Sequence, residues 1–274
     1  MSGDVSRAPF EAFFLHAGSG ERFCIFHPAN GAPLGSILYV HPFAEEMNKS
    51  RRMAAQQARA FRARGYSVLQ IDLQGCGDSG GDFGEARWEL WHDDLALAAA
   101  WLATHADGPV HLWGLRLGAL LAADHLRQAP HSFAGLLLWQ PVISGTQFMT
   151  QFLRFRLGAE MLSGAAAGKG TEQLRAQLAA GAALEIAGYE LAPPLASAIE
   201  RLDLAALAPG TCRHAGSKST PRASRLPVCS ARRARGARAA PRSNCTPCAA
   251  SRSGAPSRLP SARTSSPPLR TQWT

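Results

Sequence analysis

Short apolar runs alternate with longer segments of mixed polarity over the first 140 residues. The apolar runs have the length of strands and contain β-branched or aromatic residues, which predicts strands buried in a sheet. They lie at residues 37–40, 67–73, 110–113 and 133–139. The segments between them repeat apolar residues every three or four positions, which predicts amphipathic helices. These lie at about 49–64, 91–104 and 117–127.

This alternation predicts an α/β fold with a mostly parallel central sheet and helices on both faces. Two further runs, 10–15 and 21–27, flank a turn and predict an antiparallel hairpin at the sheet edge. From residue 147 to about 207 the pattern is helical only, rich in Ala and Leu and interrupted by glycines and by Pro193 and Pro194. We expect this segment to be a helical insertion over one end of the sheet.

The sequence Gly-Leu-Arg-Leu-Gly at 114–118 joins a predicted strand to a predicted helix. A tight turn of this kind, with small residues two positions on either side of its centre, is a nucleophile elbow, usually G-x-S-x-G. A central serine attacks a carbonyl carbon after a histidine takes its proton. Arg116 stands at the centre here, and its guanidinium stays protonated and has no lone pair to offer. Arg116 is therefore at the nucleophile position without being a nucleophile.

Two further motifs precede the elbow. The strand at 37–40 ends in His-Pro-Phe at 41–43, and the loop Asp-Leu-Gln-Gly-Cys-Gly-Asp-Ser-Gly follows at 72–80. Hydrolases of one large superfamily often carry His-Gly and Asp-x-Arg-Gly-x-Gly-x-Ser at these two places. With all three motifs in this order and spacing, residues 10–210 resemble the α/β-hydrolase superfamily.

Two stretches, 41–53 and 136–145, resemble more narrowly the second type of hydrolase associated with the bacterial exosortase A system of exopolysaccharide export and protein sorting. The resemblance implies a cytoplasmic protein of α/β-hydrolase fold with an ancestral activity on an ester or thioester acyl bond. It also implies that the backbone amides of Phe43 and Leu117 form an oxyanion hole. His41 is expected to brace the oxyanion loop by hydrogen bonding rather than to act in catalysis.

Two roles stay open for Arg116. A fixed cation beside a helix N-terminus is a receptor for carboxylate or phosphate, which would make the chain a non-catalytic protein that binds an anion or a partner. Alternatively, the guanidinium pairs with an internal acid. The candidate acids are Glu45, Glu46 and Asp78. Three other side chains could substitute for the nucleophile, but none stands on an elbow, so we assign them to turns and packing. They are Ser79, Ser144 and Cys76.

The loop at 75–80 also satisfies the dinucleotide-binding pattern G-x-G-x-x-G, with Asp94 further along the chain. Residues 81–84 prolong the loop, so the glycines do not open into a helix and no helix N-terminus meets a phosphate. We interpret the pattern as a tight connection and expect no cofactor.

Composition changes abruptly near residue 210. Residues 1–210 hold 16 Lys and Arg against all 20 Asp and Glu, whereas residues 211–274 hold 13 basic residues and no acidic one. A basic arm could bind nucleic acid, and Cys245 and Cys248 have a zinc-ligand spacing, but a second ligand pair is missing. GC-rich DNA that is read in a wrong frame encodes a composition of this kind, rich in Arg, Pro, Ala, Ser and Cys and lacking Asp and Glu. We therefore predict a disordered, out-of-frame tail and expect neither nucleic acid nor metal.

On this interpretation residues 1–210 form an α/β-hydrolase domain, with 146–207 as its helical cap, that lacks its last strands and its triad acid and histidine. The strand at 133–139 would then lie at an unprotected sheet edge, which predicts poor solubility. No apolar stretch is long enough for a secretion signal or a membrane span, and few cysteines before the tail are typical of a reducing compartment. We expect a cytoplasmic protein whose partner is a small acyl substrate or an anion, and the sequence leaves its oligomeric state open.

Overall fold

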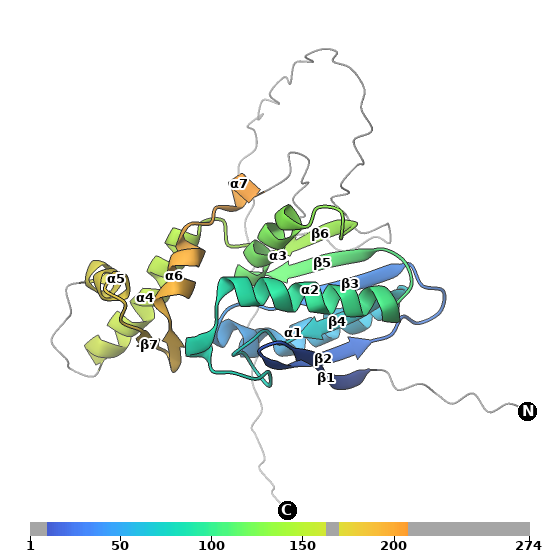
Figure 1. The fold of residues 1–274 in the computed structure, drawn as a ribbon, viewed down its shortest axis with the longest axis horizontal. Coiled ribbons are helices and arrows are strands. Elements are labelled where there is room, and N and C mark those ends of the chain that lie inside the picture. Colours follow the sequence, from blue (N-terminus) through green and yellow to red (C-terminus); the bar gives the residue numbers. More distant parts are fainter. Residues whose placement is uncertain (1–9, 163–169, 208–274) are drawn as a thin grey trace, which may run out of the picture. The chain divides into compact units, whose positions relative to one another are not determined.

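The computed structural model describes residues 10–162 and 170–207 (Figure 1). These residues all belong to the first of two compact units, 1–232 and 233–274. The predictions for the tail, including the pair Cys245 and Cys248, fall outside the described residues.

A six-stranded sheet forms the centre of the described fold, with strand order β1-β2-β4-β3-β5-β6. Its strands are β1 (Glu11–Ala17), β2 (Gly20–His27), β3 (Gly35–Val40), β4 (Tyr66–Ile71), β5 (Val110–Leu115) and β6 (Gly135–Trp139). The neighbours β4, β3, β5 and β6 run parallel, and the hairpin β1–β2 is antiparallel and joins the sheet at β4. The predicted mostly parallel sheet and its edge hairpin are confirmed.

Helices cover both faces of this sheet. They are α1 (Glu45–Arg62), α2 (Trp88–His105) and α3 (Leu117–Gln128). Helix α1 packs Ala58 and Phe61 against Ile37 and Trp113 in one apolar cluster, while α2 and α3 pack in a second, larger cluster on the opposite face. Figure 1 shows α2 crossing in front of the strands, so that the sheet lies between two helical layers.

Helix α1 begins four residues earlier than its apolar spacing predicts. The backbone turns at Ala44, which has a φ of 49°, and Glu45 and Glu46 occupy the first turn. Carboxylates are favourable there because the helix N-terminus carries a partial positive charge. This early start brings two acidic side chains to the end of β3, where the site described below lies.

The segment after β6 gathers at one end of the sheet in Figure 1. It consists of α4 (Gly145–Leu162), α5 (Thr171–Ala179), β7 (Leu184–Ile186), β8 (Tyr189–Leu191), α6 (Pro193–Glu200) and α7 (Leu204–Leu207). The prediction of helices only is wrong here, because β7 and β8 form a small antiparallel hairpin. Each strand has three residues, too few for a period of two to stand out from the surrounding Ala and Leu.

Candidate active site

The turn between β5 and α3 holds Arg116 in a backbone conformation that few side chains adopt. Its φ is 55° and its ψ is −119°, and a positive φ is unfavourable for a residue with a Cβ. The glycines on either side of it are required because neighbouring backbone atoms leave no room for a Cβ. A Cβ on Gly114 would lie 2.4 Å from the Cα of Ala119, and a Cβ on Gly118 would lie 2.2 Å from the carbonyl oxygen of His41. The helix therefore starts directly against the ends of β5 and β3.

Backbone hydrogen bonds fix Arg116 from both sides. Its amide donates to the carbonyl of Trp139 at 3.0 Å, and its carbonyl accepts from the amides of Val142 at 3.2 Å and Ala119 at 3.1 Å. The turn is thus tied to the end of β6 as well as to its own helix. Because the backbone is held this firmly, the start of the Arg116 side chain has a defined position.

The guanidinium of Arg116 pairs with the first turn of α1. Its Nε donates to Glu46, at 3.1 Å to Oε1 and 3.4 Å to Oε2. About a third of each side chain is exposed. Glu46 is thus the partner among the three acids expected from the sequence, since Glu45 pairs with Lys49 at 3.8 Å and Asp78 lies in the loop held by Asp72.

His41 at the end of β3 uses both of its ring nitrogens. Nε2 lies 3.2 Å from the backbone amide of Leu73, which donates to it, so Nδ1 carries the proton and donates to the carbonyl of Pro42 at 2.7 Å. Burial lowers the pKa of His41, and the Asp72 carboxylate opposes this. The ring therefore stays neutral and joins the ends of β3 and β4.

The peptide between Pro42 and Phe43 is oriented by this histidine. Because a trans peptide is planar, its N–H points away from its carbonyl, so the Phe43 amide is directed away from the His41 ring. Within the described part of the chain, neither the Phe43 amide nor the Leu117 amide has a backbone or side-chain acceptor. Gly118 packs against the His41 carbonyl, which brings the segments that carry these two amides together.

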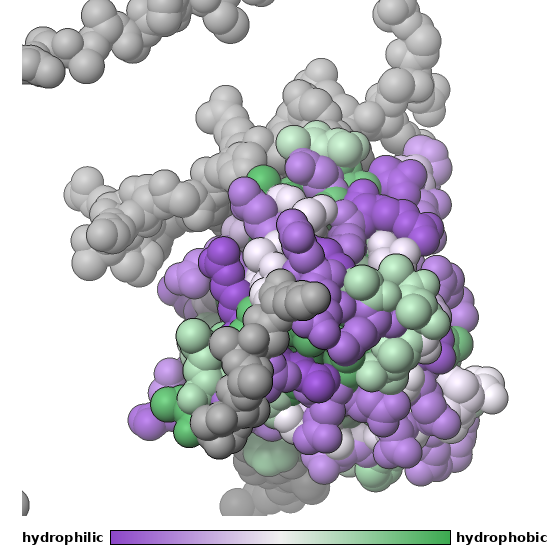
Figure 2. Space-filling model, turned by 90° about the vertical axis from the view of Figure 1, so that its left-hand side faces the viewer, coloured by the Kyte–Doolittle hydropathy of each residue, from purple (hydrophilic) through white to green (hydrophobic). Residues whose placement is uncertain are grey.

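A cavity of about 100 Å³ lies beside Arg116. Its charged side is formed by Arg116, Glu45 and Glu46, and its apolar side by phenylalanine rings. These are Phe43 from the end of β3 and Phe148, Phe152 and Phe155 from α4. Figure 2 looks onto this end of the molecule, where apolar patches lie among hydrophilic side chains. The site thus combines a fixed cation with an aromatic wall.

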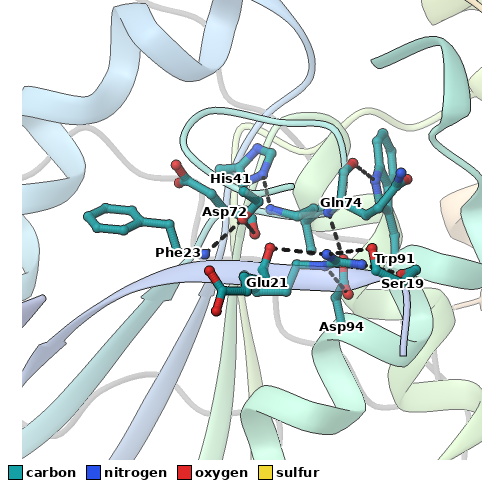
Figure 3. Close-up of polar contacts among 11 residues, drawn as sticks. Ser19, Glu21, Phe23, His41, Asp72, Gln74, Trp91 and Asp94 are labelled. Atoms are coloured by element: carbon teal, nitrogen blue, oxygen red, sulfur yellow. Dashed lines mark hydrogen bonds and ion pairs between the residues drawn. The ribbon is translucent and has the colours of Figure 1, made fainter. Parts of the chain in front are cut away.

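The glycine-rich loop after β4 is held by buried charges (Figure 3). Arg22 is fully buried and its Nε lies 2.6 Å from Oδ1 of Asp94. The other carboxylate oxygen of Asp94 accepts from the backbone amide of Gln74 at 2.7 Å, and Trp91 donates its indole N–H to the carbonyl of Gln74. Asp94 therefore anchors the start of the loop to α2.

This loop does not open into a helix. A short 3-10 turn, Phe83–Glu85, follows it, and α2 begins only at Trp88. The glycines are therefore not followed directly by a helix N-terminus, and Asp94 is engaged by Arg22.

The other hydroxyl and thiol groups considered above have structural positions. The Ser79 hydroxyl donates to the carbonyl of Asp72 and accepts from the amide of Phe23. Ser144 lies just before α4, where its hydroxyl accepts from the amide of Gln147 at 3.4 Å. Burial raises the pKa of the Cys76 thiol, which keeps it protonated. Among the residues that the structure describes, no histidine makes with any of the three the contact that nucleophile activation requires.

Comparison with known proteins fits this geometry. Residues 31–195 match the sequence model of the family described as serine aminopeptidase, S33. The chain belongs to the serine aminopeptidase S33 family. Over 92 residues the S33 chain is 32% identical to lysophosphatidylserine lipase ABHD12 from Xenopus tropicalis, a match that spans 34% of this chain and 23% of the lipase.

Two solved structures are similar to this chain at low sequence identity. The structure of Est1E from Butyrivibrio proteoclasticus with ferulic acid bound has a TM-score of 0.51 and 15% identity, covering 72% of this chain and 73% of that one. The mouse alpha/beta hydrolase domain-containing protein 10 has a TM-score of 0.47 and 16% identity, with 70% of each chain covered. The sheet order and the family match together give this chain the α/β-hydrolase fold.

The aromatic wall of this cavity was not predicted from the sequence. Phe148, Phe152 and Phe155 are spaced by four and three residues, which places them on one face of a helix, so the stripe could have been found. Their meeting with Phe43, at ring-centroid distances of 5.6 Å for Phe148 and 5.0 Å for Phe152, could not have been.

Within residues 10–162 and 170–207, no group of three or more His, Cys, Asp or Glu side chains is arranged to hold a metal ion. No helix in the same part of the chain is long and apolar enough to cross a membrane.

Proposed function

We propose that this chain is a non-hydrolytic α/β-hydrolase-fold protein of the exosortase A system-associated type, derived from enzymes that cleave an ester or thioester acyl bond. One observation carries the proposal. The residue at the bend between β5 and α3, where the backbone has a φ of 55°, is Arg116. We take this as the position from which a serine would attack.

The chemistry of the arginine supports the loss of hydrolysis. Attack on a carbonyl needs an oxygen or sulfur whose proton a base removes, and a guanidinium supplies neither a lone pair nor a proton it can lose at neutral pH. Arg116 is paired with Glu46 rather than with a histidine. Both ring nitrogens of His41 are hydrogen-bonded to backbone groups, so His41 is not available as a base.

The amides of Phe43 and Leu117 are the proposed remnant of an oxyanion hole, and His41 its brace. Their support is the hydrogen bond from His41 to the Pro42 carbonyl and the close packing of Gly118 on the His41 carbonyl. Such donors stabilise an oxyanion only when a nucleophile creates one. Without a nucleophile they would at most position a carbonyl or carboxylate oxygen.

The acyl class of the ancestral substrate is supported by the relatives. One is named a lysophosphatidylserine lipase, and the Est1E structure holds ferulic acid, an aromatic carboxylic acid. The exosortase type rests on the stretches 41–53 and 136–145. The proposal includes a cytoplasmic location, a domain at 1–210 with its cap at 146–207, and an out-of-frame segment from about 210. Reading the nucleotide sequence after codon 209 in the other two frames tests the last point.

Ester turnover tests the loss of hydrolysis. The full chain, Arg116→Ser and Arg116→Ala are incubated with p-nitrophenyl acetate, butyrate and octanoate, and with a fluorophosphonate that labels activated serines. We expect all three proteins to show the background rate and no label. Turnover by the unmodified chain that Arg116→Ala leaves intact, with a label mapped to another serine, would overturn the proposal.

A further inference from the structure

We propose that the cavity beside Arg116 binds a monocarboxylate with an apolar tail, such as a medium-chain fatty acid or an arylalkanoic acid. This inference rests on the proposed function, because it needs Arg116 to act as a fixed cation that binds a ligand. It differs from hydrolysis in that the ligand contains no bond to be cleaved.

The polar end of the cavity is an arginine with donors to spare. Arg116 uses only its Nε toward Glu46, and within the described residues its two terminal nitrogens have no hydrogen-bond partner. Those nitrogens form the edge of the guanidinium that binds a carboxylate through two parallel hydrogen bonds. Arg116 can therefore take a second carboxylate without leaving Glu46.

The apolar end is a wall of phenylalanine rings. Phe43, Phe148 and Phe152 are buried, whereas Phe155 is 54% exposed, so the cavity is apolar inside and open to solvent along α4. Phe152 and Phe155 lie edge to face at 6.3 Å between ring centroids. An acyl chain or an aryl ring placed here removes apolar surface from water on both partners, which is favourable.

Charge selects the head group. The cation of Arg116 disfavours an ammonium ligand, and the carboxylates of Glu45 and Glu46 on the same wall disfavour a phosphate dianion. Glu45 is partly neutralised by Lys49, which leaves Glu46 as the carboxylate whose charge repels a ligand bound at Arg116. A single negative charge next to a long apolar part satisfies all of these constraints.

Isothermal titration of the full chain with octanoate tests this, with octan-1-ol as the uncharged ligand of similar length. Replacing Arg116 by Gln should weaken octanoate binding by about ten- to a hundredfold, the range expected for a charge-assisted hydrogen-bonded contact, and should leave octanol binding unchanged. Glu46→Gln should strengthen octanoate binding several-fold, because it removes a carboxylate whose charge repels the bound ligand. Phe155→Ala should weaken both ligands.

Arg154→Ala is the matched control, because Arg154 is exposed on α4 and its loss changes the net charge of the protein equally. It should bind octanoate like the unmodified chain, and far-UV circular dichroism verifies that each variant is folded. Equal affinity for octanoate and octanol, undiminished binding by Arg116→Gln, or absence of octanoate binding at millimolar concentration would each overturn the inference. Ester turnover with intact acid binding would sink only the proposed function, so the two failures are distinguishable.

Discussion

Removing the Asp94 carboxylate should destabilise this fold more than the substitution of an exposed residue does. Arg22 and Asp94 are both almost fully buried, and their contact of 2.6 Å joins β2 to α2. Replacing Asp94 by Ala leaves a buried guanidinium without its counter-charge and the Gln74 amide without its acceptor. Breaking a buried ion pair in this way costs about 3–5 kcal/mol, a large part of a total stability of about 5–15 kcal/mol.

Thermal and urea unfolding of the full chain measure this loss. A loss of about 3–5 kcal/mol corresponds to a fall in Tm of roughly 10 °C for a domain of this size. Asp93→Ala is the matched control, because Asp93 is the exposed neighbour on the same helix and its removal should change stability by about 0.5 kcal/mol or less.

A double variant separates the pair from its context. Arg22→Met with Asp94→Leu removes both charges. The Gln74 amide loses its acceptor, and Ser19 and Glu21 lose the hydrogen bonds that Arg22 donates to them, so the double variant should recover only part of the loss. If Asp94→Ala unfolds at the same temperature as Asp93→Ala, the buried contact does not hold the loop to α2 and the reasoning is wrong.

Three further predictions follow from burial and contact. Burial lowers the pKa of His125 to about 4, so the unfolded chain takes up this proton at a higher pH than the folded protein does. The contribution of His125 to the free energy of unfolding is therefore complete above about pH 6.5 and falls by about 2 kcal/mol between pH 7 and 5. Urea midpoints measured across this range should fall accordingly, and His125→Gln should make them less dependent on pH. Gly118→Ala should abolish cooperative melting because its Cβ would collide with the His41 carbonyl, whereas Gly158→Ala, a site with open space on α4, should raise stability by about 0.5–1 kcal/mol. Burial raises the pKa of Cys76, so peptide mapping should find it alkylated by iodoacetamide only after denaturation; labelling of the native protein would show that the thiol is reachable.

Most of the fold could be predicted from the sequence because its signals are local. A run such as 37–40 is apolar because a strand between two helical layers is covered on both faces, and the strand β3 lies there. The spacing of Gly114 and Gly118 around Arg116 likewise follows from a turn that leaves no room for a Cβ. The hairpin β7–β8 was not predicted, because strands of three residues are too short to show a period of two in the sequence.

The site itself was decided by tertiary structure. The sequence determined that an arginine, which cannot act as a nucleophile, stands in a strand-to-helix turn, and it offered three acids as partners. Only the parallel crossover, which starts α1 at the end of β3 beside the neighbouring strand β5, selected Glu46, 70 residues away in the chain. The same is true of Arg22 and Asp94, and of the rings of α4 that meet Phe43. Contacts between distant residues depend on how elements pack, and no local pattern records that.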